Sequence, residues 1–324
     1  MIVITGALGF IGSYLISNLN KQGFNNIVAV DDFSPIVLHK KRNLNEKKIS
    51  EYVNRNDLFG WLEKNYKDVD FIFHIGARTD TMEKSEQVFN ELNLDYSKNL
   101  FLFCIEKQLP IIYASSAATY GLGENGYDDS DESTPNLKPL NPYGWSKHNF
   151  DLWVLEQNNK PPFWAGLKFF NVYGPNEYHK GKMASVIYHC FNQINETKQI
   201  NLFESHKEGI NHGHQKRDFI YVKDVVDVII WFYNVRDKSG IYNLGTGQAR
   251  TFLDLAKCVF KSMELKEQIN FIPTPESIRD SYQYFTQANM NKLISAGYTK
   301  PFTSIEDGID DYIKNYLSQG KTYY

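Results

Sequence analysis

The sequence predicts an α/β fold with a doubly wound parallel sheet and a smaller C-terminal α/β lobe. Three observations predict it. Short apolar segments typical of strands alternate with amphipathic helical segments over the first half of the chain. A glycine-rich turn directly follows the first apolar segment. From about residue 171 the alternation becomes irregular, and polar loops separate the remaining elements. Strands that alternate with helices form right-handed βαβ units, which build a parallel sheet.

The expected elements are short strands and longer amphipathic helices. Each strand is a run of β-branched and aromatic residues, and each helix carries apolar residues at a helical spacing. In chain order the first half is expected to contain Met1–Ile4, helix Phe10–Leu19, Ile27–Val30, Phe71–His74, helix Ser85–Glu106, Ile111–Ala114, helix Pro142–Glu156 and Phe163–Phe170. In the second half, a helix is expected at Val222–Tyr233 and a strand at Ile241–Leu244.

The glycine turn has a spacing that suits a bound dinucleotide. Gly6 permits a tight turn, Gly9 lets the backbone approach a pyrophosphate at the helix N-terminus, and Gly12 lets that helix pack closely on the strand. The backbone amides of Phe10 and Ile11 are expected to face the phosphates. This pattern is typical of a Rossmann-type dinucleotide-binding fold.

The glycine turn also suggests how the chain divides. Residues 1–170 are expected to form the dinucleotide-binding domain, which also receives elements from about residues 217–245. Residues 171–324 are expected to form mainly a substrate-binding lobe. Because ligands of open α/β sheets bind beyond the carboxyl ends of the strands, the substrate is expected between the two parts.

Composition and charge disfavour several classes of protein. The net charge is −3, so no broad positive surface for nucleic acid is expected. The three cysteines, Cys104, Cys190 and Cys258, lie far apart, which argues against a disulfide framework and is typical of a reducing compartment. No apolar run approaches the roughly 18 residues of a membrane span, and the chain opens directly on a strand. We therefore expect a cytoplasmic protein that binds neither membrane nor nucleic acid.

Tyr143 and Lys147 form a Tyr-x-x-x-Lys pair on an expected helix, and this spacing places both side chains on one face. A free tyrosine has a pKa of about 10 and is a poor base at neutral pH. A neighbouring ammonium and the positive charge of a nicotinamide ring both favour the phenolate. Lys147 can also reach the ribose hydroxyls of such a cofactor. The alternative interpretation is an exposed tyrosine and lysine without a chemical role.

Hydroxyl groups gather at the end of the strand that precedes this helix. Ser116 is expected to hydrogen-bond the substrate oxygen whose proton Tyr143 removes, and Ser115 is the alternative. A hydroxyl at the carboxyl end of a central strand lies at the edge where ligands of such sheets bind.

The combination of the glycine turn, Ser116, Tyr143 and Lys147 resembles that of the extended short-chain dehydrogenase/reductase superfamily, which acts on nucleotide sugars. Five further motifs resemble, over nearly the whole chain, the ADP-L-glycero-D-manno-heptose 6-epimerase family within it. The motifs are FNVYGP at Phe170–Pro175, HKGKMASV at His179–Val186, RDFIYV at Arg217–Val222, NLGTG at Asn243–Gly247 and YQYFTQ at Tyr282–Gln287. The second and the fifth are the motifs most particular to the heptose epimerases.

The resemblance implies epimerisation of ADP-D-glycero-β-D-manno-heptose at C6″, for the heptose of the lipopolysaccharide inner core. A carbon without an acidic proton must be oxidised to a ketone before hydride returns to the opposite face. Two acid/base groups on opposite sides suit this reaction, and the resemblance assigns them to Tyr143 and Lys180, with a merely solvated Lys180 as the alternative. Ala117 and Ala118 leave no carboxylate beside Ser116, which disfavours the elimination of water that related dehydratases perform.

The resemblance also implies contacts to the nucleotide sugar. Arg217 is the expected pyrophosphate ligand, because its planar fork suits phosphate oxygens. Lys182 stands where the family commonly has serine, and the loop Glu204–Lys216 is longer than usual. These departures leave open another nucleotide heptose or hexose as substrate, and a non-catalytic NADP-binding scaffold is a further alternative. The expected substrate contacts are Ser116, Asn171, Lys182, His189, Phe203, Glu204, Arg217 and Tyr282.

The expected cofactor is NADP, one per subunit and tightly bound, with NAD as the alternative. Asp31 ends the second strand, where an acid binds a ribose 2′-hydroxyl and favours NAD. The family that the chain resembles nevertheless prefers NADP. Lys40 and Arg55 match the basic residues that bind the 2′-phosphate of NADP in that family. The alternative for Lys40 is that it belongs to a solvated basic run. The other expected cofactor contacts are Gly6, Gly9, Phe10, Ile11, Gly12, Asp32, Gly76, Ala77, Asn93, Lys147, Val172 and Lys180.

No metal site is expected. His206, His212 and His214 share one polar loop, but no cysteine or carboxylate is spaced to complete a ligand set. The family resemblance implies a homo-oligomer, with pentamers among the forms that the family adopts.

Overall fold

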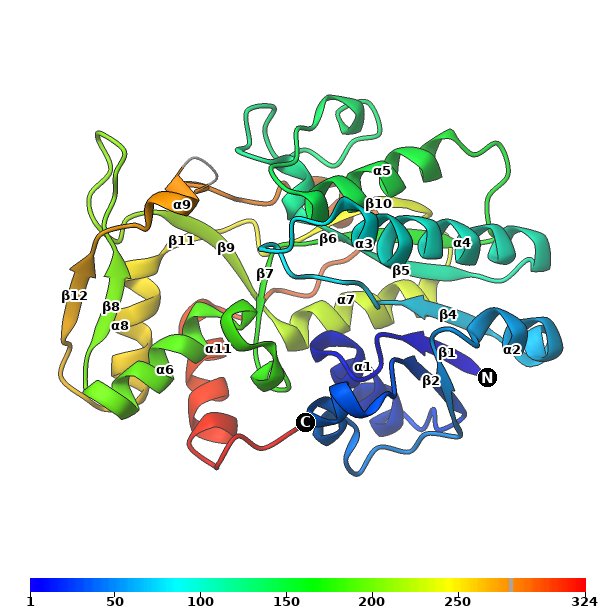
Figure 1. Cartoon of the computed structure of the whole chain (residues 1–324), viewed down its shortest axis with the longest axis horizontal. Coiled ribbons are helices and arrows are strands. Elements are labelled where there is room, and N and C mark those ends of the chain that lie inside the picture. Colours follow the sequence, from blue (N-terminus) through cyan, green and yellow to red (C-terminus); the bar gives the residue numbers. More distant parts are fainter. Residues whose placement is uncertain (280–281) are drawn as a thin grey trace.

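The computed structural model describes residues 1–279 and 282–324, apart from the side chains at positions 36, 38 and 277. Its centre is a parallel sheet of seven strands in the order β10-β6-β5-β4-β1-β2-β3 (Figure 1). The strands are β1 (Ile2–Thr5), β2 (Ile27–Asp31), β3 (Glu51–Asn54), β4 (Phe71–His74), β5 (Ile111–Ser116), β6 (Trp164–Phe169) and β10 (Gly240–Leu244). The predicted α/β fold with a doubly wound parallel sheet is confirmed.

The strand order reverses between β1 and β4, since the chain runs outward from β1 to β3 and then crosses back to β4. At such a reversal the loops that leave the two strands diverge, which opens a crevice for a ligand. Thr5 pairs with Val30 on one side and with His74 on the other, so three strand ends lie level. The glycine turn therefore begins at the point where this fold binds ligands.

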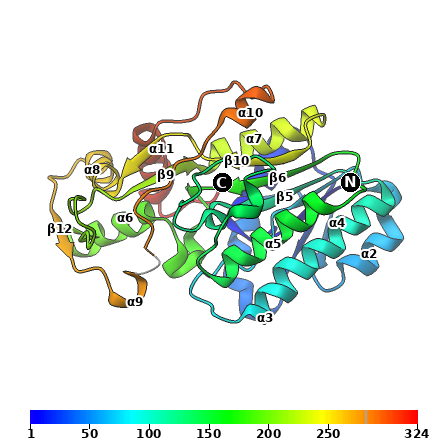
Figure 2. The same cartoon turned by 90° about the horizontal axis from the view of Figure 1, so that it is seen from above.

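Helices cover both faces of the sheet, as Figures 1 and 2 show. On one face α1 packs against α7, and Ile2 and Ile4 of β1 belong to their core. Val3 points to the opposite face and joins a second core with Leu100 and Phe150. Because successive strand residues point to opposite faces, a strand covered on both sides must be apolar throughout. The helices are α1 (Phe10–Lys21), α2 (Leu58–Asn65), α3 (Glu86–Phe89), α4 (Tyr96–Lys107), α5 (Pro142–Glu156) and α7 (Val222–Val235).

The C-terminal lobe lies beyond the carboxyl ends of the large sheet (Figure 1). It contains a three-stranded sheet, β11-β9-β7, and a two-stranded sheet, β12-β8. Its strands are β7 (Asn171–Tyr173), β8 (Ile200–Phe203), β9 (Lys216–Tyr221), β11 (Ala249–Thr251) and β12 (Ile269–Ile272). Its helices are α6 (Val186–Thr197), α8 (Phe252–Ser262), α9 (Glu276–Arg279), α10 (Asn291–Ser295) and α11 (Ile305–Tyr312). The helix α7 and strand β10 return from this half of the chain to the large sheet.

The structure differs from the sequence prediction at β3 and in the helix that follows β4. Strand β3 was not expected, because only Val53 of its four residues is buried and the segment therefore lacks an apolar run. The single helix expected at Ser85–Glu106 consists of α3, a π-helical segment at Asn90–Asp95 and α4. Periodicity cannot reveal such a segment, since the wider turn depends on what its side chains bind in the folded chain.

The glycine turn leaves no space for added atoms, so Gly12→Ala is expected to destabilise the protein by about 1–3 kcal/mol. A methyl group on Gly12 would lie 2.2 Å from the Gly6 carbonyl oxygen. Gly60→Ala in α2 is the matched control, because no atom lies within 4 Å of its added methyl. This control should keep or gain stability, by up to about 1 kcal/mol. Urea unfolding measures both, and equal stabilities would contradict the prediction.

Candidate active site

The glycine turn is held against the end of β4. Gly6 has a φ of +71°, and a Cβ there would lie 2.6 Å from the Gly76 Cα, so only glycine fits this approach. Gly9 is the N-cap residue of α1 and provides no capping side chain, and the first turn of α1 carries no acidic residue. The first backbone amides of a helix are unsatisfied and attract an anion. The turn is therefore a fit for the pyrophosphate of a dinucleotide, with Phe10 and Ile11 as the first two helical residues.

Two acids and two cations lie at the end of β2. One Asp31 carboxylate oxygen accepts a hydrogen bond from the Leu8 amide (2.9 Å). Burial raises the pKa of Asp31, and hydrogen bonds from backbone amides and the charges of Lys40 and Arg55 oppose that rise. Arg55 pairs with Asp32 at 3.3 Å, while its buried Nε has no partner among the residues that the structure describes. This corner can hold a ribose hydroxyl through Asp31 and has positive charge for a phosphate.

Ser116, Tyr143 and Lys147 meet where β5 ends and α5 begins. Burial raises the pKa of Tyr143, and a side-chain hydrogen bond with Ser116 lowers it. The Lys147 Nζ donates to the Ala114 carbonyl oxygen at 2.8 Å, and burial lowers the pKa of Lys147 to about 8. Asn141 caps the start of α5 by accepting from the backbone amide of the third helical residue (2.8 Å). The structure thus brings the three residues together, with the lysine charged at neutral pH.

Lys180 reaches the glycine turn from the C-terminal lobe, on the 3₁₀ segment Tyr178–Met183 that follows β7. Its Nζ lies 5.8 Å from the ring centroid of Phe10. Burial lowers the pKa of Lys180, whereas the charge of Glu177 raises it. The buried Glu177 carboxylate accepts hydrogen bonds from the backbone amide and the hydroxyl of Ser185, which closes the loop around Lys180.

Asn43 joins this loop to the dinucleotide-binding turn, and sequence reasoning missed it. Its side-chain amide donates to the Leu8 carbonyl (2.9 Å) and to the Asn176 carbonyl (3.2 Å), and it contacts His179 Nδ1 at 3.2 Å. It lies in a 3₁₀ segment at Pro35–Leu44, within a basic run whose composition gives no hint of a buried amide.

Asn93 holds the loop that follows β4. Its carbonyl oxygen accepts from the Arg78 amide (2.8 Å), and its amide donates to the Arg78 carbonyl (2.9 Å) and to the Ser146 hydroxyl (3.0 Å). Asn93 lies in the π-helical segment, and its contacts tie Gly76 and Ala77 to α5 through the residue that follows them. These contacts are with the protein itself, so a contact between Asn93 and the cofactor stays a prediction.

Part of the predicted substrate set forms one aromatic cluster in the C-terminal lobe. The Phe203 and Tyr282 rings lie 6.4 Å apart, and the Arg217 guanidinium carbon lies 5.6 Å from the Tyr282 ring centroid. The rings of His206 and Tyr284 lie 6.0 and 5.5 Å from the Tyr282 ring, and a hydrogen bond of 2.9 Å joins His206 Nδ1 to the Tyr284 hydroxyl. From the sequence, His206 was weighed as a metal ligand and not as a neighbour of Tyr284. The two residues are far apart in the chain, so spacing could not show that the YQYFTQ motif lies beside the loop of His206.

The remaining predicted substrate and cofactor residues differ in exposure. Asn171 and Lys182 are exposed, while Val172, His189 and Glu204 are half-buried. Within the described ranges no hydrogen bond joins these five side chains to Tyr143. Their roles stay predictions, as do those of the other site residues.

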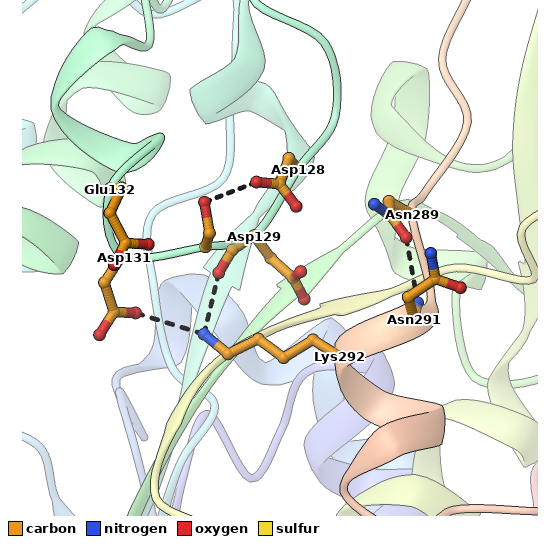
Figure 3. Close-up of a pocket in the computed structure, with 8 residues that line it drawn as sticks. Asp128, Asp129, Asp131, Glu132, Asn289, Asn291 and Lys292 are labelled. Carbon is orange, nitrogen blue, oxygen red and sulfur yellow. Dashed lines mark hydrogen bonds and ion pairs between the residues drawn. The ribbon is translucent and has the colours of Figure 1, made fainter.

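A separate acidic hollow of about 330 Å³ lies apart from these groups (Figure 3). Lys292 crosses it, donating to the Asp129 carbonyl (3.0 Å) and pairing with Asp131 at 3.2 Å. None of its lining residues belongs to the predicted site; they are Asp128, Asp129, Ser130, Asp131, Glu132, Asn289, Asn291 and Lys292. Among residues 1–279 and 282–324, no group of three or more His, Cys, Asp or Glu side chains is arranged to hold a metal ion.

Comparison with known proteins places the chain in a class. Residues 2–245 match the sequence profile of the NAD dependent epimerase/dehydratase family. The chain belongs to this family, and its cofactor is a nicotinamide dinucleotide.

Individual relatives are more specific. A protein of Fusobacterium nucleatum named ADP-L-glycero-D-manno-heptose-6-epimerase is 45% identical over all of both chains. A protein of the same name from Nitratidesulfovibrio vulgaris is 43% identical over 98% of each. The crystal structure of the Helicobacter pylori ADP-L-glycero-D-manno-heptose-6-epimerase has a TM-score of 0.79 and 29% identity, covering 97% of this chain and 95% of that one. These relatives confirm the resemblance drawn from the motifs.

None of the helices in the described part of the chain has both the length and the apolar character required to cross a bilayer.

His74 makes stability depend on pH. It is buried at the end of β4, between the hydroxyls of Thr5 (2.7 Å) and Ser97 (2.9 Å). Burial lowers its pKa to about 3, against about 6.5 in an unfolded chain. The unfolded state therefore binds the proton more readily, so stability present above pH 6.5 is lost as the pH falls toward 3.

Urea unfolding at pH 7 and pH 5 tests this expectation. The wild type should lose about 2 kcal/mol more than His74→Gln between the two pH values, since glutamine does not titrate. His39→Gln, at an exposed histidine, should lose as much as the wild type. An equal loss in wild type and His74→Gln would show that burial does not keep His74 neutral.

Proposed function

We propose that this protein converts ADP-D-glycero-β-D-manno-heptose into ADP-L-glycero-β-D-manno-heptose by inverting C6″, supplying heptose for the lipopolysaccharide inner core. The observation that carries the proposal is the full-length similarity to relatives named as this epimerase. The geometry supports it, because Ser116 at the end of β5 lies close enough to Tyr143 to lower its pKa, while Lys180 reaches Phe10 from the other part of the chain.

The residues of this chain supply proton transfer and orientation. When bound, the nicotinamide supplies hydride transfer from and back to the substrate carbon. Ser116 hydrogen-bonds the reacting oxygen and Tyr143 exchanges a proton with it. Burial raises the pKa of Tyr143, Ser116 opposes this rise, and the Asp151 charge adds to it. We propose that the Lys147 ammonium favours the phenolate during the reaction, as a neighbouring cation does. Lys180 is the second acid/base group, and an exchange of roles between Tyr143 and Lys180 permits inversion.

A second candidate is an epimerase or reductase of another nucleotide sugar in the same superfamily. The exposed Lys182, in place of the usual serine, and the long loop between β8 and β9 favour it. A non-catalytic NADP-binding scaffold is disfavoured, because a protein that only binds NADP does not need Ser116, Tyr143 and Lys147 to meet at one place.

We further propose that the cofactor is tightly bound NADP, one per subunit. Asp31 suits a ribose hydroxyl, but Lys40 and Arg55 both act on Asp31, and the Arg55 Nε is buried without a partner in the described residues. A 2′-phosphate would satisfy this excess of donors. Gly6, Gly9 and Gly12 would hold the pyrophosphate.

The remaining proposals concern organisation. The family resemblance supports a cytoplasmic homo-oligomer, with a pentamer as the expected form. We propose an NADP-binding domain at residues 1–170, which also takes elements from about 217–245, and a substrate-binding lobe mainly at 171–324. The place of α7 and β10 on the large sheet supports this division.

Incubation with ADP-D-glycero-β-D-manno-heptose should yield the L-glycero epimer, resolved by proton NMR. Tyr143→Phe and Lys180→Met should each lower the initial rate by about two to four orders of magnitude, because each removes an acid/base group. Lys261→Met, at an exposed lysine of α8, is the matched control and should retain the wild-type rate.

Two outcomes would contradict this assignment in different ways. Turnover of another nucleotide sugar, without conversion of the ADP-heptose by the wild type, would refute the proposed substrate. A rate near that of the wild type in either variant would refute the role of that residue alone.

The dinucleotide released when the purified protein is denatured should be NADP, as identified by chromatography. Changing both Lys40 and Arg55 to alanine should shift the ratio of retained NADP to NAD by about tenfold or more toward NAD, because two charged donors are lost. Lys41→Ala, at an exposed neighbour, should leave the ratio unchanged. Release of NAD from the wild type would overturn the proposed cofactor.

A further inference from the structure

A fully buried ion pair lies beneath the proposed catalytic residues and has no role in the function so far described. Lys168 of β6 and Asp151 of α5 meet at 2.8 Å, and both side chains are 0% exposed. Removing two charges from water is costly, and apolar residues of similar size often stabilise a core as well or better. Stability therefore gives little reason for a pair at this position, and its neighbours suggest another.

Asp151 extends the stripe of reactive residues along α5. Tyr143, Lys147 and Asp151 are spaced by four residues, which places all three on one face of the helix. The Asp151 carboxylate accepts hydrogen bonds from the Ser115 hydroxyl (2.6 Å) and the Tyr113 hydroxyl (3.2 Å) of β5. Asp151 is therefore bonded to β5 at Ser115, the residue directly before Ser116.

Lys168 reaches Ser116 from the other side. Its Nζ donates to the Thr119 hydroxyl oxygen at 2.9 Å, and that hydroxyl donates to the Ser116 carbonyl oxygen at 2.9 Å. Ser115 and Lys168 are also register partners on the adjacent strands β5 and β6. Two hydrogen-bonded routes from the ion pair therefore converge on the backbone at Ser116.

The two charges act in opposite directions on the groups around them. Burial is the largest effect on both neighbours, since it raises the pKa of Tyr143 and lowers that of Lys147. The Asp151 charge raises the pKa of both. On His148, where burial is again the largest cause, Lys168 lowers the pKa and Asp151 raises it. The titratable groups that face the pair are Tyr113 of β5, Tyr120 of the turn after β5, and Tyr143, Lys147 and His148 of α5. The charge of Lys147 in turn lowers the pKa of His74 of β4, although burial is the larger cause of that shift.

We propose that Asp151 and Lys168 are positioning residues for the reaction: as a pair they hold Ser116 within reach of Tyr143, and together they keep the surroundings of Tyr143 free of a net negative charge. This inference rests on the proposed function for the role of Tyr143. The pair is buried because a carboxylate shielded from water binds Ser115 and Tyr113 firmly, and Lys168 is the cation that makes this carboxylate tolerable.

The charge effect is measured without substrate, by carbon NMR of the purified holoprotein labelled at the tyrosine Cζ. Tyr143→Phe identifies the resonance of Tyr143. Lys168→Met should raise the pKa of Tyr143, because the Asp151 carboxylate is then unbalanced. Asp151→Asn should lower it, because the Lys168 ammonium is then unbalanced. Lys168→Arg keeps the charge and should restore the wild-type titration.

The positioning effect is measured in the epimerase reaction. Asp151→Asn and Lys168→Met should each lower kcat by about tenfold near neutral pH while KM changes little, because neither residue touches the substrate. The pH profile of kcat should move in the direction found for Tyr143 in each variant. Lys223→Met is the matched control: it removes the lysine of a partly exposed ion pair with Asp311 (2.6 Å) and should leave kcat and its pH profile unchanged.

Shifts of the same sign in both single variants, or no shift in either, would overturn the proposal. So would a fall in kcat that Lys168→Arg does not rescue. If Lys168→Met fails to fold, the direction of the Asp151→Asn shift and the Lys168→Arg rescue decide alone. A wild type that does not epimerise the ADP-heptose would refute the proposed function, whereas the tyrosine titration would still test the ion pair.

Discussion

The close approach of Gly6 to Gly76 is the contact on which the site depends. It brings the end of β1 against the end of β4 at the place where the strand order reverses, with no room for a Cβ between the two backbones. Because the turn is this tight, α1 begins at once, and no side chain caps its first amides. Asp31, Arg55 and the Lys180 loop all gather around this one turn.

Burial governs the chemistry of the site more than any single ion pair does. Burial is the largest cause of the raised pKa of Tyr143 and of the lowered pKa values of Lys147 and Lys180. Each shift disfavours the charged form, so each residue has lost part of the water that would otherwise stabilise its charge. Removal of water makes proton transfer between such groups sensitive to a substrate or cofactor charge placed beside them.

The two halves of the chain share one apolar core, and amide and carboxylate side chains add directed contacts between them. Asn43 links the glycine turn to the segment before Lys180, and Glu177 closes that segment on Ser185. Within the first half, Asn93 links the loop after β4 to α5 in a similar way. Hydrogen bonds of this kind depend on direction, so they fix where a side chain such as Lys180 lies as well as holding it.

The fold class, the glycine turn, the Tyr143–Lys147 pair and the family could all be predicted from the amino-acid sequence, because each depends on local spacing or on contiguous motifs. The sequence did not reveal β3, a largely polar strand that is held by pairing with β2. Nor did it reveal the π-helical segment around Asn93. Only the tertiary structure joined Asn43 to the glycine turn and Asp151 to Lys168. These contacts bridge residues that are far apart in the chain or on different elements, and a buried polar side chain leaves no periodic signal in a sequence.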